Sequence, residues 1–174
     1  NSKIKYINSA ENFIFKKSEN LYGLKQNIEN IRNNNELILV EGYLDVLGLN
    51  SNKIETSVAS LGTTLSETQI NKIWSIVDIP IICFDGDIAG LKAMKSIALK
   101  VLKYLNPGKS VKFIILPEGQ DPDNYINQFG KESFKKLKLN ANNLSDLIWE
   151  IIISDNNNTP EFLALVDEEI KKIS

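Results

Sequence analysis

The chain has 174 residues, of which 43% are hydrophobic, and a formal net charge of −2. That length allows one compact domain with an appended part. The near-neutral charge argues against a broadly basic protein that binds nucleic acid by charge alone. The absence of histidine, with a single cysteine, excludes a Cys/His zinc site, a Ser-His or Cys-His nucleophile and an internal disulfide. Any catalysis therefore has to use carboxylates, lysines, hydroxyls or an oxygen-bound metal.

The sequence contains neither an apolar run of about 18 residues nor a secretory signal. We therefore expect a soluble cytoplasmic protein without membrane contact. Cys83 falls in an apolar strand pattern, where a buried, unreactive thiol is expected. Neither end resembles a natural terminus, so we expect a fragment.

The predicted elements begin with a lysine-rich, aromatic-dotted stretch and a helix over 21–31. Apolar runs then predict strands over 37–41, 56–60, 80–85 and 111–116, separated by helical patterns over 43–49, 66–77 and 88–105. Ser66 and Gln69 have the spacing of a capping box at the start of the second of these helices. This alternation predicts an α/β fold with a mainly parallel four-stranded sheet flanked by helices. Further helices over 123–129, 131–137, 144–154 and 160–173 predict a C-terminal helical subdomain.

Acidic residues follow three of the four predicted strands. Glu41 closes the first strand, and Asp85 and Asp87, on either side of Gly86, close the third. Because strands of one polarity end at the same edge of a parallel sheet, these carboxylates should converge. Clustered oxygen donors without imidazole or thiolate favour Mg²⁺ or Mn²⁺.

Asp121 and Asp123 follow the fourth strand and so fall on the same edge, and Asp45 lies one helical turn after Glu41. Taken singly, these acids have ordinary explanations. Asp87 suits the N-cap of the next helix, and Asp121 before a proline suits a helix start. Helix capping does not explain why acids from three strands share one edge.

The basic residues have two interpretations. Lysines along the helix over 88–105 are typical of a solvated face. Lys5 and Lys17 instead alternate with aromatic residues, as in surfaces that track phosphates and stack on bases.

The motifs KYINS (5–9), LYGL (21–24), VEGYLDV (40–46), ASLGT (59–63), DGDIAG (85–90) and EGQDPD (118–123) occur in this order. Together they resemble the Toprim domain of bacterial DNA primase of the DnaG type, across about residues 3–135. The resemblance implies that residues 1–35 end the N-terminal part of the polymerase core, that 36–132 form the Toprim domain, and that 133–174 form a truncated helical subdomain.

The same resemblance implies DNA-dependent RNA primer synthesis at replication forks, with nucleotidyl transfer from NTPs on a single-stranded DNA template. It assigns Glu41, Asp85 and Asp87 as metal ligands for two or more Mg²⁺ or Mn²⁺ ions, without zinc in this fragment. Asp121, Asp123 and Asp45 would complete the acidic cluster. Lys5, Lys17 and Asn8 would hold template or nucleotide phosphates.

The resemblance further implies a monomer that joins the primosome, with a replicative helicase bound through a downstream domain absent here. The family's upstream zinc-binding domain and an earlier, arginine-bearing part of its core are also absent. Whether this fragment is active alone therefore stays open.

Three alternatives remain. The same acids serve phosphodiester cleavage in Toprim nucleases and topoisomerases. A phosphatase of the haloacid-dehalogenase type also places Asp-x-Asp after a strand, but Ala89 replaces its usual Thr or Val. A non-catalytic module would bind metal, or would bind a partner through a terminal stripe of Leu147, Ile148, Ile151 and Ile152.

Overall fold

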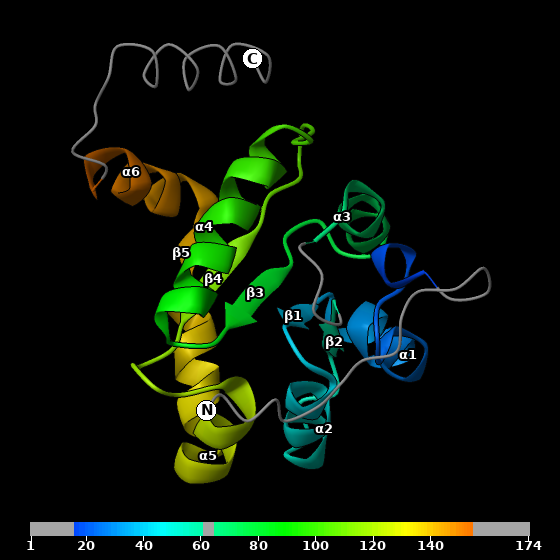
Figure 1. The fold of residues 1–174 in the computed structure, drawn as a ribbon. Helices are drawn as coiled ribbons and strands as arrows, with labels where there is room; N and C mark the ends of the chain where they lie inside the picture. The colour runs from blue at the N-terminus through cyan, green and yellow to red at the C-terminus, as the bar shows by residue number, and fades with distance from the viewer. Residues whose placement is uncertain (1–15, 61–64, 155–174) are drawn as a thin grey trace.

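The structure, a computed structural model, describes residues 16–60 and 65–154, without the side chains of 152–154 (Figure 1). Within these ranges, no helix is long and apolar enough to cross a membrane. The elements in chain order are η1 (Lys17–Glu19), α1 (Leu24–Asn34), β1 (Ile38–Val40), α2 (Tyr43–Ser51), β2 (Ser57–Ala59), α3 (Glu67–Trp74), β3 (Ile81–Phe84), α4 (Ile88–Leu102), β4 (Lys112–Ile115), α5 (Pro122–Leu139), β5 (Asn142–Asn143) and α6 (Leu144–Ser154). The expected helix over 160–173 lies outside the described residues.

The strands form one sheet in the order β2-β1-β3-β4-β5. β1 pairs in parallel with β2 and β3, and β3 pairs in parallel with β4. The expected α/β fold with a mainly parallel sheet is confirmed. The structure adds β5, a fifth strand that the sequence did not predict, which runs antiparallel to β4.

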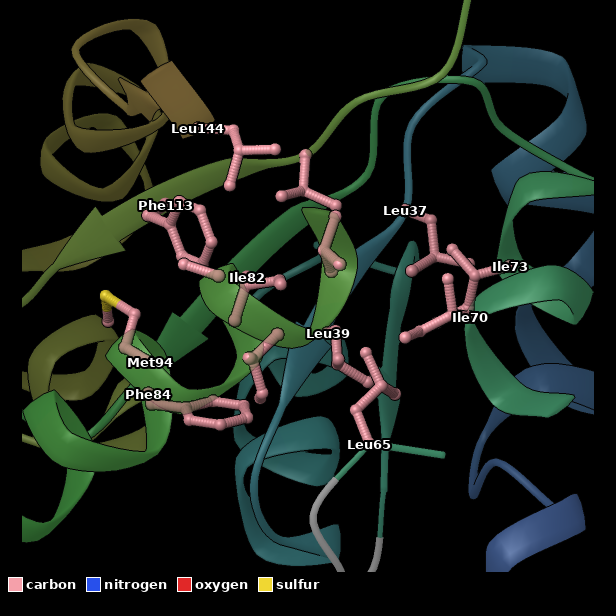
Figure 2. Close-up of a cluster of buried hydrophobic side chains, with 14 of the residues drawn as sticks. Leu37, Leu39, Leu65, Ile70, Ile73, Ile82, Phe84, Met94, Phe113 and Leu144 are labelled. Carbon is pink, nitrogen blue, oxygen red and sulfur yellow. The ribbon is translucent and has the colours of Figure 1, made fainter. Parts of the chain in front are cut away.

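Two hydrophobic layers cover the sheet. Leu37 and Leu39 belong to the layer shared with α3, α4 and α6, whereas Ile38 and Val40 belong to the layer shared with α2 and α5. Successive residues of a strand point to opposite faces, so the β1 segment is buried on both sides. Figure 2 shows part of the first layer, where Ile82 lies between the β4 residue Phe113 and the β1 residue Leu39.

Helix α6 belongs to this core. Leu147, Ile148 and Ile151 are buried in the first layer, and Leu144 at the start of α6 lies beside Phe113 (Figure 2). The alternative in which these α6 residues form a partner-binding stripe is therefore wrong for these three side chains. The side chain of Ile152 lies outside the described residues.

Local signals set the helix boundaries. The capping box at α3 is confirmed, because the Gln69 backbone N–H donates to Ser66 Oγ at 3.1 Å and Ser66 N–H donates to Gln69 Oε1 at 2.9 Å. α1 begins at Leu24, later than expected, because Gly23 adopts a left-handed conformation with φ of 80°. The two helices expected around residue 130 run together as α5 but are interrupted at Gly130, where φ is 79° and ψ is 170°.

Candidate metal centre at the carboxyl edge of the sheet

The sheet places the predicted acids at one edge. Glu41 directly follows β1 and Asp85 directly follows β3, and these strands are neighbours. Asp121 lies at the start of α5, after β4, the other neighbour of β3. Since all three strands run in parallel, their carboxyl ends lie together.

Two of these acids also cap helices. Asp87 Oδ1 accepts a 2.7 Å hydrogen bond from the Gly90 backbone N–H at the start of α4. Asp121 Oδ1 accepts a 2.6 Å hydrogen bond from the Asn124 N–H at the start of α5. The capping explanation therefore holds for both residues, and it fixes where their carboxylates lie.

Backbone hydrogen bonds join the loop after β3 to the loop after β4. The Gly86 N–H donates to the Gln120 carbonyl at 2.8 Å, and the Gly119 N–H donates to the Gly86 carbonyl at 3.3 Å. A Cβ at position 86 would lie 2.1 Å from the Pro117 carbonyl oxygen, so only glycine allows this approach. The two acidic loops are thereby held together.

Asp45 lies in the first turn of α2. It is 8% exposed, and its Oδ2 accepts a 2.9 Å hydrogen bond from the Gly42 N–H. Burial raises the pKa of Asp45 to about 6, and the charges of Asp121 and Asp123 add to this rise, whereas backbone hydrogen bonds from Gly42 and Asp123 oppose it. A buried acid thus ties the start of α2 to the start of α5.

Asp85 carries the largest resolved pKa shift among the aspartates at this edge. Burial raises its pKa to about 7, and further increases come from the charges of four carboxylates: Asp45, Glu41, Asp121 and Asp87. The pKa of Glu41 is also raised, first by burial and then by Asp87. Each carboxylate at this edge is harder to ionise because the site is partly buried and its neighbours carry the same charge.

Asp123 is positioned by the contact between α2 and α5, which Figure 1 shows side by side. Its Oδ1 accepts a 2.7 Å hydrogen bond from Asn127 Nδ2, and Asn127 Oδ1 accepts one of 3.1 Å from Asn52 Nδ2. A Cβ on Gly48 would lie 2.0 Å from Asp123 Oδ1. Glycine at this point of α2 makes room for the carboxylate.

Among the described residues, no three acidic, histidine or cysteine side chains have the arrangement of a preformed metal site. The carboxylates are close enough to shift one another's pKa, and several are occupied by hydrogen bonds to helix starts. Their chemistry still fits a hard divalent cation, because oxygen donors that repel one another gain from a neutralising ion.

Of the three predicted phosphate-binding residues, the structure describes Lys17. Lys5 and Asn8 lie outside the described residues. Lys17 lies in η1, where its carbonyl accepts a 2.9 Å hydrogen bond from Gln69 Nε2 at the start of α3. The buried cysteine is where the sequence placed it, and burial raises the pKa of the Cys83 thiol well above its ordinary value.

Comparison with known proteins agrees with this architecture. The profile of the family described as Toprim-like matches residues 38–126, about half of the chain. The chain belongs to the Toprim-like family. Residues 38–126 of this Toprim-like chain contain all the strands that end at the acidic edge, and membership implies divalent-metal binding in general.

Relatives and solved structures of this Toprim-like chain extend the likeness beyond that match. The DNA primase of Rickettsia felis is 40% identical over 168 residues, which cover 96% of this chain and 28% of the relative. The structure of the DnaG primase catalytic domain bound to ssDNA has a TM-score of 0.88 at 33% identity, covering 99% of this chain and 56% of that one. A DNA primase domain from Pseudomonas aeruginosa has a TM-score of 0.88 at 35% identity. The match covers 98% of this chain and 55% of that domain's chain. The chain thus spans about a quarter of the curated relative's length.

Two residues that shape the edge were not predicted. Gly48 makes room for Asp123, and Gln120 accepts the hydrogen bond that joins the loops. Neither has a signal in the sequence, because one depends on how α2 meets α5 and the other uses only its backbone carbonyl.

Proposed function

We propose that this chain forms part of the catalytic core of a DNA primase, which makes RNA primers from NTPs on a single-stranded DNA template. One observation carries the proposal. Glu41, Asp85 and Asp121 lie at the edge where the neighbouring parallel strands β1, β3 and β4 end, in a chain 40% identical to a DNA primase over 96% of its length. At this edge burial, and then the charges of four carboxylates, raise the pKa of Asp85. The DnaG structure bound to ssDNA supports the nature of the template.

In this proposal Glu41, Asp85 and Asp87 hold two or more Mg²⁺ or Mn²⁺ ions. The chemistry that such ions would supply is stabilisation of the negative charge on the attacking and leaving oxygens when a primer 3′-hydroxyl displaces pyrophosphate from the α-phosphorus of an NTP. Asp121 and Asp123 complete the acidic edge, the first by capping α5 and the second through its contact with α2.

Asp45 supports the other acids from the first turn of α2, where it is buried and accepts a hydrogen bond from the Gly42 backbone N–H. Lys17, Lys5 and Asn8 bind template or nucleotide phosphates. The proposed divisions are 1–35, 36–132 and 133–174, the last including β5 and α6. Further partners are a replicative helicase and the primosome, bound by a monomer in the cytoplasm.

The test is calorimetric titration of ATP into the chain with and without Mn²⁺. The variant Asp85→Asn/Asp87→Asn removes two charges, and asparagine at position 87 still caps α4. The matched control is Asp146→Asn, which changes an exposed acid in the first turn of α6. We expect nucleotide binding that depends on metal, that is lost in the double variant and that is unchanged in the control.

The same substitutions in the full-length protein should lower primer synthesis on a single-stranded template by about 100-fold or more. Full primer synthesis by the double variant would refute the assignment of these acids. Metal-dependent cutting of DNA without primer synthesis would instead point to the nuclease alternative.

A further inference from the structure

A polar cavity of about 310 Å³ opens at the opposite edge of the sheet from the acids. Glu36 in its wall precedes β1 and Thr56 precedes β2, so the cavity lies at the amino ends of these strands. We call it the lysine cavity, since its charged lining consists of Lys53, Lys131, Lys135, Lys138, Glu36 and Glu55. Those six side chains carry a formal charge of +2 in a chain whose total is −2.

One wall of the lysine cavity is fixed by an ion pair. Lys138 Nζ lies 2.8 Å from Glu36 Oε1 and 2.6 Å from Oε2, and Thr56 Oγ1 donates to the same Oε1 at 2.9 Å. The side chains of Lys138 and Glu36 are 18% and 27% exposed. Partial burial and three hydrogen bonds hold this pair in one arrangement.

A second part of the lining contains Lys53 and Lys131. Lys131 Nζ donates a 2.6 Å hydrogen bond to the Lys53 carbonyl, and Lys53 has a left-handed backbone with φ of 61°. Within the described part of the chain, no hydrogen bond or ion pair engages the Lys53 ammonium. Its backbone is thus anchored while its charge is available to a ligand.

Lys135 supplies another cation. Its only described ion pair is with Glu132 at 2.7 Å, and these side chains are 46% and 78% exposed. Exposed pairs of this kind add little stability, so Lys135 can turn toward a ligand at small cost. The pKa of Glu132 lies below its ordinary value, first because of the hydrogen bond and charge of Lys135 and then because of Lys131 and Lys136. This part of α5 is therefore a positive surface.

The remaining wall comes from α1. Asn30 Nδ2 donates to Glu55 Oε2 at 3.3 Å, and Asn34 Nδ2 donates to the Asn30 carbonyl at 2.8 Å. Both asparagines line the cavity, where their amides can bind hydroxyl or ring atoms beside a phosphate.

We propose that the lysine cavity binds the phosphate groups of a small polyphosphate, a diphosphate or a nucleotide. Lysine ammonium groups are point charges suited to phosphate oxygens, and the volume matches the low end of ligand pockets, about 300–1,000 Å³. Glu36 and Glu55 in the same lining disfavour the continuous backbone of a nucleic acid strand. The site is separate from the acidic edge and needs no metal.

The test is calorimetric titration of inorganic pyrophosphate, and separately of ADP, into the chain in EDTA, which prevents binding through metal at the acidic edge. Lys53→Gln/Lys135→Gln removes the two cations that can turn to a ligand, and Lys25→Gln is the control, since Lys25 is an exposed α1 lysine outside the cavity lining. We expect binding that weakens by about tenfold or more in the double variant, that is unchanged in the control, and that falls as salt rises. Amide NMR shifts should cluster at Asn30, Lys53 and Thr56.

Three outcomes would overturn the proposal: no binding of either probe, equal binding by the double variant, or NMR shifts centred on Asp85 and Asp121. Displacement of pyrophosphate by a single-stranded oligonucleotide, with both affinities lowered in the double variant, would assign the phosphates to a nucleic acid strand and also reject the small ligand. Melting curves establish that each variant is folded. Failure of the primase proposal would leave this result unaffected, because the titration contains no metal, template or NTP.

Discussion

Gly86 and Gln120 are joined by a 2.8 Å backbone hydrogen bond that ties the loop after β3 to the loop after β4. Asp85 and Asp87 flank the donor, and Asp121 follows the acceptor. The bond therefore sets the separation between two groups of acids that repel one another. The backbone carries no net charge, yet its hydrogen bond holds these repelling carboxylates in positions where a cation can bind between them.

Replacing Gly86 with alanine should break this connection. The new Cβ would lie 2.1 Å from the Pro117 oxygen and 2.6 Å from the Leu116 oxygen, and neither backbone group can rotate away. We expect a loss of about 1–3 kcal/mol in unfolding free energy together with weaker Mn²⁺ binding. Gly108→Ala is the control, because φ there is 81° and the space is open, so it costs stability through strain alone. Equal Mn²⁺ affinity in the two variants would show that the loop contact does not organise the acids.

Asp85 should make the metal-free chain more stable at lower pH. Its pKa in the folded chain is raised from 3.8 to about 7, so the folded state binds the proton more tightly than the unfolded state does. The stability of the metal-free chain should therefore rise as pH falls from about 8 to about 5. At pH 8, Asp85→Asn should add about 1–2 kcal/mol once solvent screening is allowed for, and should flatten the pH dependence.

Melting temperatures in EDTA across this pH range measure the effect. Asp146→Asn serves as the control, because this acid is exposed in the first turn of α6. A destabilised Asp85→Asn variant at pH 8 would mean that the carboxylates do not oppose folding.

Mg²⁺ should stabilise the folded chain more at high pH than at low pH, which is the opposite of the pH dependence expected without metal. An ion that binds only the folded chain stabilises it by about 2.7 kcal/mol at about 100 times its dissociation constant. We expect this gain at pH 8, a smaller gain at pH 6 where protons compete for Asp85, and none in Asp85→Asn/Asp87→Asn. Thermal melts with and without Mg²⁺ provide the measurement, and a gain that survives in the double variant would place the ion elsewhere.

Gly48 and Asp123 should be energetically coupled. Gly48→Ala brings a Cβ within 2.0 Å of Asp123 Oδ1, so the carboxylate has to move and lose its 2.7 Å hydrogen bond from Asn127. We expect a cost of about 1–2 kcal/mol in the wild type and a cost smaller by about 1 kcal/mol in Asp123→Ala. Some cost remains there, because the position-123 Cβ lies 3.0 Å away. The free energies of unfolding are measured by chemical denaturation. If Gly48→Ala costs the same in the wild type and in Asp123→Ala, the two residues are not coupled and the contact is contradicted.

Much of the fold could be predicted because two of the parallel strands, β1 and β3, are apolar runs directly followed by acids. β1 and β3 are almost wholly buried, so their sequences carry no alternation and stand out from the amphipathic helices. β5 escaped prediction because it consists of Asn142 and Asn143, which pair with β4 without any hydrophobic pattern. Its pairing is a consequence of tertiary structure.

The sequence was sufficient to predict which acidic residues share the carboxyl edge of the sheet. Asp85 and Asp121 could be placed there because each follows a parallel strand. The burial of Asp45 could not be foreseen, since an acid in the first turn of a helix is ordinarily solvated, and here α2 meets the start of α5. The lysine cavity was also missed, because it joins side chains from α1, α5 and two loops.

The break in α5 at Gly130 separates the acidic start of the helix from its lysine-rich second half. Asp121 and Asp123 lie at its first end, and Lys131, Lys135 and Lys138 follow the break. A continuous helix would act as a rigid rod, so that a shift at one end would displace the other. At Gly130 the backbone leaves the helical conformation, so the two halves are joined through the core, where Ile126 and Phe134 pack in one hydrophobic layer, and not through one continuous helix. Substitutions of exposed lysines in the basic half that spare Phe134 can therefore be made without changing the helix start that carries the acids.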